Sequence, residues 1–577
     1  MLARQCLRGV MNRVISPVMA PPPRFNLSQT MQEAIALHQK GQLREAEKLY
    51  ARVLKAAPDT FDALHLLGTI KAQAGQMGEA LRLITAALKI NPRVPEALVN
   101  LANVMHALKR DAEALDCLDK ALAIAPDDLH ALQNRGSALL ALNRPQDALD
   151  CFERVLGREP GNVDALLNRG VAKATLGRNA EALADFDAAL RLAPGHPGIL
   201  YNRGSARLQL DRPAEAIADF DHALAATPQH AGAWNNRGRA LQLLNRQREA
   251  VASFDKAIAL QKDYADAHFN RAMALLTLGE LQKGFEEYEW RWKRSGMTDT
   301  RRAYNRPLWL GEFPLGHKTI LLHAEQGLGD TIQFARYAPM LARDGARVVL
   351  EVQPTLQNLL GGLAGVASCH ARGETLPAFD LHCPLGSLPL ALKTEAATVP
   401  ADIPYLHADA TRIAKWRPKI EALPGKRVAL AWAGQPNHAN DRNRSIDPKL
   451  LEPLLSLDGL SFVSIQRELR DNDAAWLTRQ TNVTHLGGDL ADMADTAAVT
   501  ALVEVVIAVD TSVVHLAGAL GRPVWVMLPF TPDWRWTLSG DSSPWYPQAR
   551  LFRQPAAGDW PSVVASIRDA LVKFAAN

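Results

Sequence analysis

The sequence has few of the features that mark extracellular, membrane-spanning or nucleic-acid-binding proteins. Its 577 residues include five cysteines, and none of them forms a Cys-x-x-Cys pair. This cysteine usage is typical of a reducing compartment without a disulfide framework. No apolar run approaches the length of a membrane-spanning helix. The formal net charge of +4 is too small for a chain of this size to predict a broad nucleic-acid-binding surface. We therefore expect a cytoplasmic protein with no transmembrane segment and no nucleic-acid partner.

The composition is otherwise that of an ordinary globular protein. Apolar residues make up 47% of the chain and charged residues 22%, which is usual for folded domains. The length predicts three or four domains. The N-terminus differs, because residues 1–24 are basic, lack acids and end in a proline cluster. We interpret residues 1–26 as a disordered leader, with a targeting segment or a true start near Met31 as open alternatives.

A 34-residue repeat runs through the first half of the chain. An alanine recurs at this step from Ala46 to Ala250, and a small residue recurs in a second register that includes Gly136. Proline keeps the same step six times, at Pro58, Pro92, Pro126, Pro160, Pro194 and Pro228. A fixed period of this length is the signature of stacked helical hairpins, each of which buries its apolar face against its neighbours.

Each repeat is predicted to form two helices joined by a short turn. Within residues 163–194, apolar residues recur at three- and four-residue steps on both sides of Gly177. The register of Gly177 holds glycine, asparagine or aspartate in the other repeats, with Lys109 as the exception. Those three residue types tolerate the left-handed backbone that such a turn needs. The pattern resembles the tetratricopeptide repeat over residues 27–294, in about eight repeats of which the last is degenerate.

Another register carries asparagine on the first helix of each hairpin. The run comprises Asn100, Asn134, Asn168, Asn202, Asn236 and Asn270. It resembles the asparagine ladder of the O-linked N-acetylglucosamine transferases, which grips the backbone of an extended polypeptide on the concave face. An amide offers both a donor and an acceptor, so it satisfies peptide groups without reading side chains. The alternative is a structural ladder that bridges neighbouring repeats. The arginines that follow each asparagine from Asn134 onward, such as Arg135, are expected to form surface ion pairs.

After Trp292 the period stops, and short β-rich runs alternate with helical stretches. Six runs predict strands, at residues 318–323, 347–352, 427–434, 461–466, 504–510 and 523–529. Apolar strands that alternate with helices predict parallel sheets with helices on both faces. We expect two α/β units, residues 295–412 and 413–577, with the stretch 399–426 as their hinge. A ligand would lie between them at the carboxyl ends of the strands.

The first motif at such a strand end is HAEQGLGDTIQFARYAPML, residues 323–341. Gly327 and Gly329 allow a tight turn into a helix that is predicted to start near Asp330. Asp330 would point into the cleft from the first helical turn, where the helix dipole favours an ionised carboxylate. The plainer interpretation is an aspartate that only caps the helix.

The second motif, residues 508–536, begins AVDTSVVHLAGALGRPVWVML. A strand is predicted to end at Asp510, and Thr511 and Ser512 open a helix whose free N–H groups form an anion site. His515 lies four residues after Thr511, on the same helical face. Together these residues suit a pyrophosphate, whereas the plainer interpretation is a capped helix with a hydrogen-bonded histidine.

The two motifs, in this order and at this separation, resemble the signature regions of the ADP-heptose:lipopolysaccharide heptosyltransferase family over residues 317–555. The resemblance implies the GT-B architecture, in which two Rossmann-like units surround a nucleotide-sugar cleft, and an inverting transfer. It implies that Asp330 is the general base. The donor-binding segment implied by the resemblance comprises Asp510, Thr511, Ser512 and His515.

The family's basic residue near the diphosphate falls within residues 441–447, where Arg444 is favoured over Arg442. An arginine there keeps the positive charge of the family's usual lysine but changes its geometry. Ser512 replaces the glycine that the family has after Asp-Thr, and the family's acceptor-binding features are not recognisable. These departures concern the lipopolysaccharide acceptor more than the fold.

The implied reaction is a single inverting displacement, with Asp330 taking the proton of the acceptor hydroxyl. The helix start, Arg444 and His515 would stabilise the leaving nucleoside diphosphate. No metal or other cofactor is expected, because the helix dipole and arginine neutralise the charge. Gln466 and Glu468, at the end of a predicted strand, are candidates for contacts with the nucleoside.

Two further stretches near the predicted site have structural interpretations. Residues 471–473, Asp-Asn-Asp, are an acid cluster that would suit a metal, but we interpret them as solvated surface. Residues 529–536, PFTPDWRW, are expected to form a flexible rim loop whose tryptophans are hard to explain as core.

The sequence therefore predicts an α-solenoid of tetratricopeptide hairpins followed by an α/β GT-B module of two Rossmann-like units. The leading interpretation is a metal-independent glycosyltransferase that uses a nucleotide-sugar donor, with a protein or peptide acceptor in the concave groove of the solenoid. One alternative is a transferase that acts on a glycan or lipid-linked sugar. Another is an interaction scaffold whose transferase-like domain is inactive.

Overall fold

The computed structural model describes residues 26–295, 302–437 and 440–576. The chain forms two compact units, one ending at Ala206 and one starting at Arg207. The predicted leader, residues 1–26, lies outside the described residues except for Asn26, which caps the first helix through a hydrogen bond from Gln29 N.

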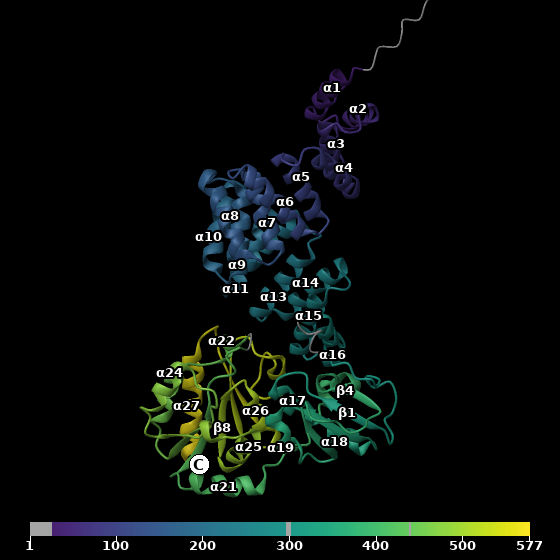
Figure 1. Ribbon diagram of the computed structural model, residues 1–577. Coiled ribbons are helices and arrows are strands. Elements are labelled where there is room, and N and C mark those ends of the chain that lie inside the picture. Colours follow the sequence, from purple (N-terminus) through teal and green to yellow (C-terminus); the bar gives the residue numbers. More distant parts are fainter. Residues whose placement is uncertain (1–25, 296–301, 438–439, 577) are drawn as a thin grey trace, which may run out of the picture. The chain divides into compact units, whose positions relative to one another are not determined.

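Between residues 26 and 295, sixteen α-helices follow one another as eight hairpins (Figure 1). The predicted helical solenoid is thus confirmed. The helices are α1 (Leu27–Gln39), α2 (Leu43–Ala56), α3 (Phe61–Gln73), α4 (Met77–Ile90), α5 (Pro95–Ala107), α6 (Asp111–Ile124), α7 (Leu129–Ala141), α8 (Pro145–Arg158), α9 (Val163–Thr175), α10 (Asn179–Leu192), α11 (Pro197–Gln209), α12 (Pro213–Ala226), α13 (Ala231–Leu243), α14 (Gln247–Leu260), α15 (Ala265–Thr277) and α16 (Leu281–Tyr288).

The turn of every hairpin has one residue in the left-handed region. The φ angles lie between 55° and 80° at Gly41, Gly75, Lys109, Asn143, Gly177, Asp211, Asn245 and Gly279. The predicted turn register is therefore confirmed, and Lys109 adopts the same conformation although a lysine side chain disfavours it. The repeat imposes this backbone on whichever residue stands there.

Close packing within the hairpins depends on the small residue of the first helix. A Cβ on Gly136 would lie 2.5 Å from the ring of Phe152, and Gly170 and Gly238 face Phe186 and Phe254 in the same way. Charged pairs join neighbouring hairpins at the surface, as predicted. Arg135 pairs with Asp119 at 2.7 Å, and equivalent pairs form at Arg203–Asp187, Arg237–Asp221 and Arg271–Asp255.

The last hairpin shares a hydrophobic core with the α/β region. Leu276, Leu281 and Phe285 belong to the same buried cluster as Ile320 and Val348. A 3-10 helix, η1 (Glu289–Lys293), follows α16. Because this core crosses the end of the repeats, the compact-unit boundary lies within the solenoid, ahead of its last three turns.

The first α/β region is a four-stranded parallel sheet in the order β3-β2-β1-β4. Its strands are β1 (Thr319–His323), β2 (Arg347–Val352), β3 (Val366–Ala371) and β4 (Leu381–Pro384). The accompanying helices are α17 (Leu328–Ala335), α18 (Ala338–Arg343), η3 (Pro354–Leu356), α19 (Gln357–Leu360), η4 (Leu385–Ser387), α20 (Leu388–Ala391) and η5 (Ala396–Thr398).

The second region is a six-stranded parallel sheet in the order β10-β9-β8-β5-β6-β7. Its strands are β5 (Lys426–Ala431), β6 (Leu460–Ser464), β7 (Val483–His485), β8 (Val505–Val509), β9 (Val524–Leu528) and β10 (Ala549–Arg553). The helices are α21 (Ala410–Glu421), α22 (Asp441–Arg444), η6 (Pro448–Leu451), α23 (Glu452–Leu455), α24 (Asp471–Leu477), η7 (Gly487–Asp489), α25 (Met493–Leu502), α26 (Ser512–Ala519), η8 (Trp534–Trp536) and α27 (Trp560–Ala576).

Helices cover both faces of the second sheet, as predicted for parallel strands. Alternate residues of β8 belong to two different cores: Val506 and Ala508 pack with α25 and α26, whereas Val505, Ile507 and Val509 pack with α23 and α27. In Figure 1, α26 and α27 lie on opposite sides of β8. All six predicted strands are present, and β3, β4, β7 and β10 were missed because they are short or lie at sheet edges. The predicted hinge contains α21, and the predicted boundary at residue 412, inside that helix, stays a prediction.

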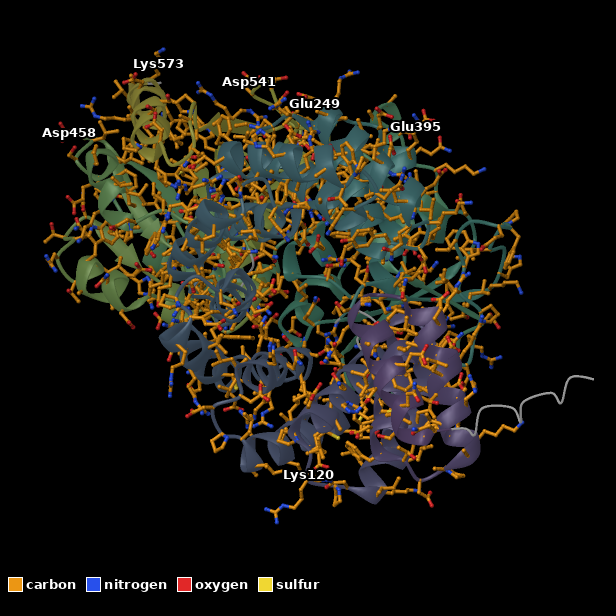
Figure 2. The ribbon with its side chains drawn as sticks, turned by 90° about the horizontal axis from the view of Figure 1, so that it is seen from above. Lys120, Glu249, Glu395, Asp458, Asp541 and Lys573 are labelled. Carbon is orange, nitrogen blue, oxygen red and sulfur yellow. The ribbon has the colours of Figure 1, made fainter. Side chains whose placement is uncertain are left out.

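Charged side chains project outward from the ends of the helices and loops, as Glu395, Asp458, Asp541 and Lys573 do in Figure 2. Among the described residues, none of the helices combines the length and the apolar character needed to span a lipid bilayer.

Candidate functional site

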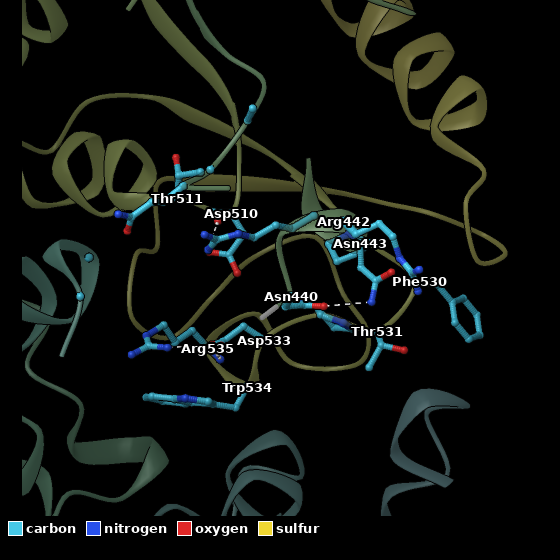
Figure 3. A pocket seen from close by; sticks show the side chains of 18 of the residues that line it. Asn440, Arg442, Asn443, Asp510, Thr511, Phe530, Thr531, Asp533, Trp534 and Arg535 are labelled. Atoms are coloured by element: carbon cyan, nitrogen blue, oxygen red, sulfur yellow. Dashed lines mark hydrogen bonds and ion pairs between the residues drawn. The ribbon is translucent and has the colours of Figure 1, made fainter. Parts of the chain in front are cut away.

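A cavity of about 1700 Å³ lies at the carboxyl ends of strands from both sheets. Gln326–Asp330 follow β1, Ala433 and Gly434 follow β5, and Asp510 follows β8. Residues of the last repeats also line it. Figure 3 shows Asp510 and Thr511 on one side of the cavity and Asp533, Trp534 and Arg535 across from them. The chain thus brings both predicted motifs to one space.

The N-terminus of α26 opens onto this cavity. Thr511 is the N-cap residue but makes no side-chain capping bond, and its Oγ1 is buried without a hydrogen-bond partner. The first N–H groups of a helix have no partner within the helix. Thr511 and Ser512 both line the cavity, so hydroxyl and backbone donors are available there to an anionic group.

Arg444 stands beside this helix start. Its Nη1 donates to Asp510 O at 3.0 Å. Its Nε is buried without a hydrogen-bond partner and lies 3.9 Å from Asp441 Oδ1. A Cβ on Gly434 would lie 2.6 Å from Nη2 of Arg444, so the glycine makes room for the guanidinium. Arg442, the other predicted cation, is 72% exposed and pairs with Asp211 at 3.2 Å. Arg444 is therefore the cation placed against the end of β8.

Asp330 occupies the third position of α17 and lines the cavity. Its Oδ2 accepts a hydrogen bond from Gly327 N at 3.1 Å, so it caps the helix from the third position, whereas the plainer interpretation placed it at the N-cap, which is Gly327. Its Oδ1 is in addition paired with Arg535 of η8. Arg535 also contacts Asp533 Oδ1, at 2.9 Å, and Gln333 Oε1. Capping and the predicted orientation toward the cavity are thus combined in one carboxylate.

Two acids near the cavity have strongly perturbed pKa values. Burial, followed by the charge of Asp533, raises the pKa of Asp510 to about 7. Burial likewise raises the pKa of Glu325 to about 7, against the opposing effect of Arg291. Burial by itself would lower the pKa of Arg535, but the carboxylates of Asp533, Asp330 and Asp510 leave it raised. Arg535 is therefore a fixed cation among Asp330, Asp510 and Asp533, and of these three acids Asp510 has a pKa raised to about 7.

His515 is buried next to the first-turn residues of α17. Its Nδ1 lies 3.1 Å from the Tyr546 hydroxyl, and its ring stacks on Trp536 with centroids 5.7 Å apart. A Cβ on Gly329 would lie 2.7 Å from its ring. Burial lowers the pKa of His515 well below its ordinary value, so the imidazole is neutral.

The two predicted nucleoside contacts differ in the structure. Gln466 is 5% exposed, and its amide is used by the backbone: Oε1 accepts from Trp432 N and Ala433 N, both at 3.1 Å, and Nε2 donates to Ala433 O and Glu468 O, both at 3.0 Å. Its side chain thus holds the loops after β5 and β6 together. Glu468 is exposed and lines the cavity.

One structural interpretation of the sequence is wrong, and a second holds only in part. The stretch 529–536 contains η8, and Trp534 and Trp536 are buried in the core shared by both sheets, because they pack against Phe285 and His515. In the predicted solvated cluster, Asp471 and Asn472 are exposed, as expected. Asp473 is instead 3% exposed and accepts a hydrogen bond from Trp432 Nε1 at 3.1 Å. Asp533 and Arg535, which lie on either side of Trp534 in the same motif, were not predicted as site residues.

The asparagine ladder is only partly exposed along its length. Asn100 Nδ2 contacts His65 Nε2 at 2.9 Å, Asn134 Nδ2 donates to Asn103 Oδ1 at 2.8 Å, and Asn270 Nδ2 donates to Asn235 Oδ1 at 3.0 Å. These three bonds join neighbouring repeats. Asn202 instead donates to Gly198 O of its own helix. A structural role is thus present at three positions, and the peptide-binding role stays a prediction.

The repeats match known tetratricopeptide proteins. Residues 134–197, 201–261 and 244–297 match one tetratricopeptide repeat model, residues 93–158 match a second, and residues 39–121 match a model of subunit 3 of the anaphase-promoting complex, or cyclosome. The N-terminal half of the chain therefore consists of tetratricopeptide repeats.

One curated relative and several solved structures are similar to parts of the chain. Protein FlbA of Caulobacter vibrioides is 30% identical in an alignment of 327 positions that covers 52% of this chain and 54% of that protein. The chain thus spans about half the length of this relative. A tetratricopeptide repeat protein from Parabacteroides merdae is 21% identical, with a TM-score of 0.37 over 43% of this chain and 98% of its own. YrrB, described as a repeat protein with an unusual peptide-binding site, is 22% identical, with a TM-score of 0.28 over 32% of this chain and 95% of its own.

Proposed function

We propose that the chain is an inverting glycosyltransferase that uses a nucleotide-sugar donor, with the repeats recruiting a polypeptide acceptor. One observation carries the proposal: Asp330 from the first sheet lines the same cavity as Arg444 and the start of α26 from the second. A carboxylate base that faces an anion site across a cavity of this size suits the displacement of a diphosphate by a hydroxyl group.

The strand orders support two Rossmann-like units in a GT-B arrangement. Numbered within its own unit, the second sheet has the order 6-5-4-1-2-3, which is the doubly wound order read from the other edge. The first sheet has the order 3-2-1-4. The strand order reverses between β5 and β8, and ligands of such sheets bind outside the carboxyl ends at this point. Ala433 and Asp510, which follow those two strands, line the cavity.

In the proposed reaction, the acceptor oxygen bonds to the anomeric carbon while the bond from that carbon to the diphosphate oxygen breaks. Asp330 takes the hydroxyl proton, and the electron pair of the broken bond stays on the departing nucleoside diphosphate. The first N–H groups of α26 and the guanidinium of Arg444 stabilise that charge. His515 is neutral, because burial lowers its pKa. Its ring packs against Gly329 and so orders the starts of α26 and α17 relative to each other.

A polypeptide acceptor is supported by the face of α15 that borders the cavity. Asn270, Met273 and Thr277 are spaced three and four residues apart and so share one helical face. Met273 and Thr277 line the cavity. Within the compact unit that holds the cavity, the asparagine register of α15 therefore continues along the same helical face to residues that line the space in which Asp330 lies. A glycan or lipid-linked acceptor would make no use of this continuity.

A second candidate is an interaction scaffold with an inactive α/β region. The repeat matches favour protein binding by themselves. The engagement of both Asp330 oxygens, by Gly327 N and by Arg535, favours a structural carboxylate. A transferase and a scaffold differ in one respect that is simple to measure, namely whether a nucleotide sugar binds.

The test is a thermal-shift panel of nucleoside diphosphates and nucleotide sugars on the full chain. A ligand at one hundred times its dissociation constant adds about 2.7 kcal/mol of stability. Arg444→Ala should abolish the shift, and Arg568→Ala, an exposed arginine of α27, should leave it unchanged. No shift with any nucleotide, or an equal shift in both variants, would contradict the proposal and favour the scaffold.

A further inference from the structure

One turn of the repeats differs from all the others in its surroundings. Of the eight left-handed turn residues, seven are exposed and Asn245 is half-buried. Its Nδ2 donates to Phe530 O at 2.7 Å. Its Oδ1 is buried without a hydrogen-bond partner, which costs free energy. The side chain therefore keeps this orientation for the bond to Phe530.

The contact is reinforced from the opposite side. Thr531 Oγ1 donates to Leu243 O at 3.0 Å. The turn between α13 and α14 thus gives one hydrogen bond to the loop after β9 and receives one from it. Two such bonds fix the direction of the loop as well as its distance, because the donors and acceptors alternate along both segments.

The same short loop carries the cation that holds Asp330. Asp533 accepts from Arg535 N at 3.1 Å and from Arg535 Nη1 at 2.9 Å, so it orients the guanidinium. Arg535 then pairs with Asp330 of α17. Figure 3 shows Phe530, Thr531, Asp533 and Arg535 along this loop at the cavity. A continuous series of contacts therefore runs from the repeat turn to the proposed base.

We propose that Asn245 is a positioning residue: through Phe530, Thr531 and Arg535, the seventh repeat holds the proposed base Asp330 in its working orientation. This inference rests on the proposed function for the role of Asp330. It gives the solenoid a task beyond acceptor recruitment, because the α/β region by itself lacks the turn that anchors this loop.

A second turn lies near the cavity in the same register but contributes less. Asp211 pairs with Arg442 at 3.2 Å, with side chains 50% and 72% exposed. Exposed ion pairs of this kind contribute little because water and salt screen them. The half-buried hydrogen bonds of Asn245 and Thr531 therefore carry most of the anchoring.

The test uses the full chain with Asn245→Gly, which removes the amide and keeps a residue that favours positive φ. Asn143→Gly is the matched control, since Asn143 is the exposed turn residue of the fourth repeat, with a φ of 55°. Thr531→Val removes the reciprocal bond, and Thr531→Ser retains the hydroxyl and should behave as the wild type.

Amide hydrogen exchange is the first readout. Loss of one hydrogen bond should raise exchange about five-fold in residues 529–537 and in residues 326–336. Asn245→Gly and Thr531→Val should show this rise, and Asn143→Gly should not. Unchanged exchange in residues 326–336 would overturn the proposal, because the anchor would then not reach the helix of Asp330.

The second readout is hydrolysis of whichever nucleotide sugar stabilises the wild type. Asn245→Gly should lower kcat about five-fold and leave the donor KM unchanged, because the donor side of the cavity is not altered. An unchanged kcat would overturn the positioning role. If no nucleotide sugar binds the wild type, the proposed function fails, while the exchange measurement still shows whether the repeat turn orders the helix of Asp330.

Discussion

The guanidinium of Arg535 is paired with the carboxylate of Asp330, although the two residues belong to different α/β regions and lie 205 positions apart. Arg535 is 10% exposed at its side chain, and Asp533 contacts the same guanidinium. A cation thus stands between two acids at the point where the two regions meet the cavity. This arrangement links the stability of the molecule to the orientation of the proposed base.

Replacing Arg535 should destabilise the protein. Arg535→Gln leaves two acids near each other without their cation, and loss of one partner from a mostly buried pair costs about 3 kcal/mol. Arg535→Lys keeps the charge but loses the forked geometry, so it should recover only part of that loss. Urea denaturation of both variants, with the exposed Arg568→Gln as control, measures the difference. Equal stability of all three would mean that the pair contributes nothing.

The buried Glu325 should make stability depend on pH. Burial raises its folded-state pKa to about 7, above the unfolded value, so its stabilising effect is complete below the unfolded pKa and is lost as pH rises through about 7. Glu325→Gln has no such titration and should therefore become more stable relative to the wild type, by up to about 3 kcal/mol, between about pH 5 and pH 7.5.

Unfolding midpoints of the two proteins, measured across that pH range, test this expectation. Asp510, whose pKa is raised in the same direction, is present in both and cancels in the difference. The glutamine keeps the acceptor for Gly386 N, which lies 3.0 Å from Glu325 Oε1. Parallel pH profiles would show that Glu325 is ionised in the folded protein throughout.

Gly329→Ala should disturb the junction between the two helix starts. The added Cβ would lie 2.7 Å from the His515 ring, which is itself fixed by Trp536 and Tyr546. Overpacking of this kind costs about 1–3 kcal/mol. Gly488→Ala is the matched control, because a Cβ there meets nothing within 4 Å. Thermal unfolding of the pair checks the prediction, and equal midpoints would mean that the histidine can move aside.

Substitutions in the asparagine ladder should impair sugar transfer to a protein acceptor and leave binding of the nucleotide-sugar donor unchanged. Asn168→Ala, Asn202→Ala and Asn236→Ala combined remove three amides from the row and should abolish sugar transfer to a protein acceptor. Donor binding in the thermal-shift assay should be unchanged, since these residues do not line the cavity. The exposed Asn91→Ala serves as control. Unaltered sugar transfer would contradict the peptide-binding role and mean that the asparagine ladder has only a structural role.

The repeats and the strands could be predicted because both follow from local patterns. Glycine, asparagine and aspartate recur every 34 residues and predict the left-handed turn of each hairpin. Lys109 adopts the same backbone conformation because the repeats on either side of it fix the position of the turn. Asp330 and Asp510 were found because each follows an apolar run, and parallel strands place their carboxyl ends at one edge.

The partners of those residues could not be predicted, because contacts between distant segments depend on which faces pack together. Gln466 lines the cavity, and its nucleoside contact stays a prediction, but the hydrogen bonds of its amide to Trp432 and Ala433 of another loop had no signal in the sequence. Trp534 and Trp536 were expected in a flexible rim loop, yet they are buried in the core, where Phe285 of the last hairpin packs on Trp534 and His515 packs on Trp536.

The sequence by itself therefore determined the helical repeat and the alternation of strands and helices. It also determined that Asp330 and Asp510, which follow predicted strands, line the cavity. Only the tertiary structure decided that Arg535 would reach Asp330 and that Asn245, 285 positions from Phe530, would hold the same loop. The physical reason is that the spacing of apolar residues along the sequence sets the secondary structure of each element and the face that it buries. The pairing of polar groups across such separations is set by the relative placement of packed elements, which no local pattern contains.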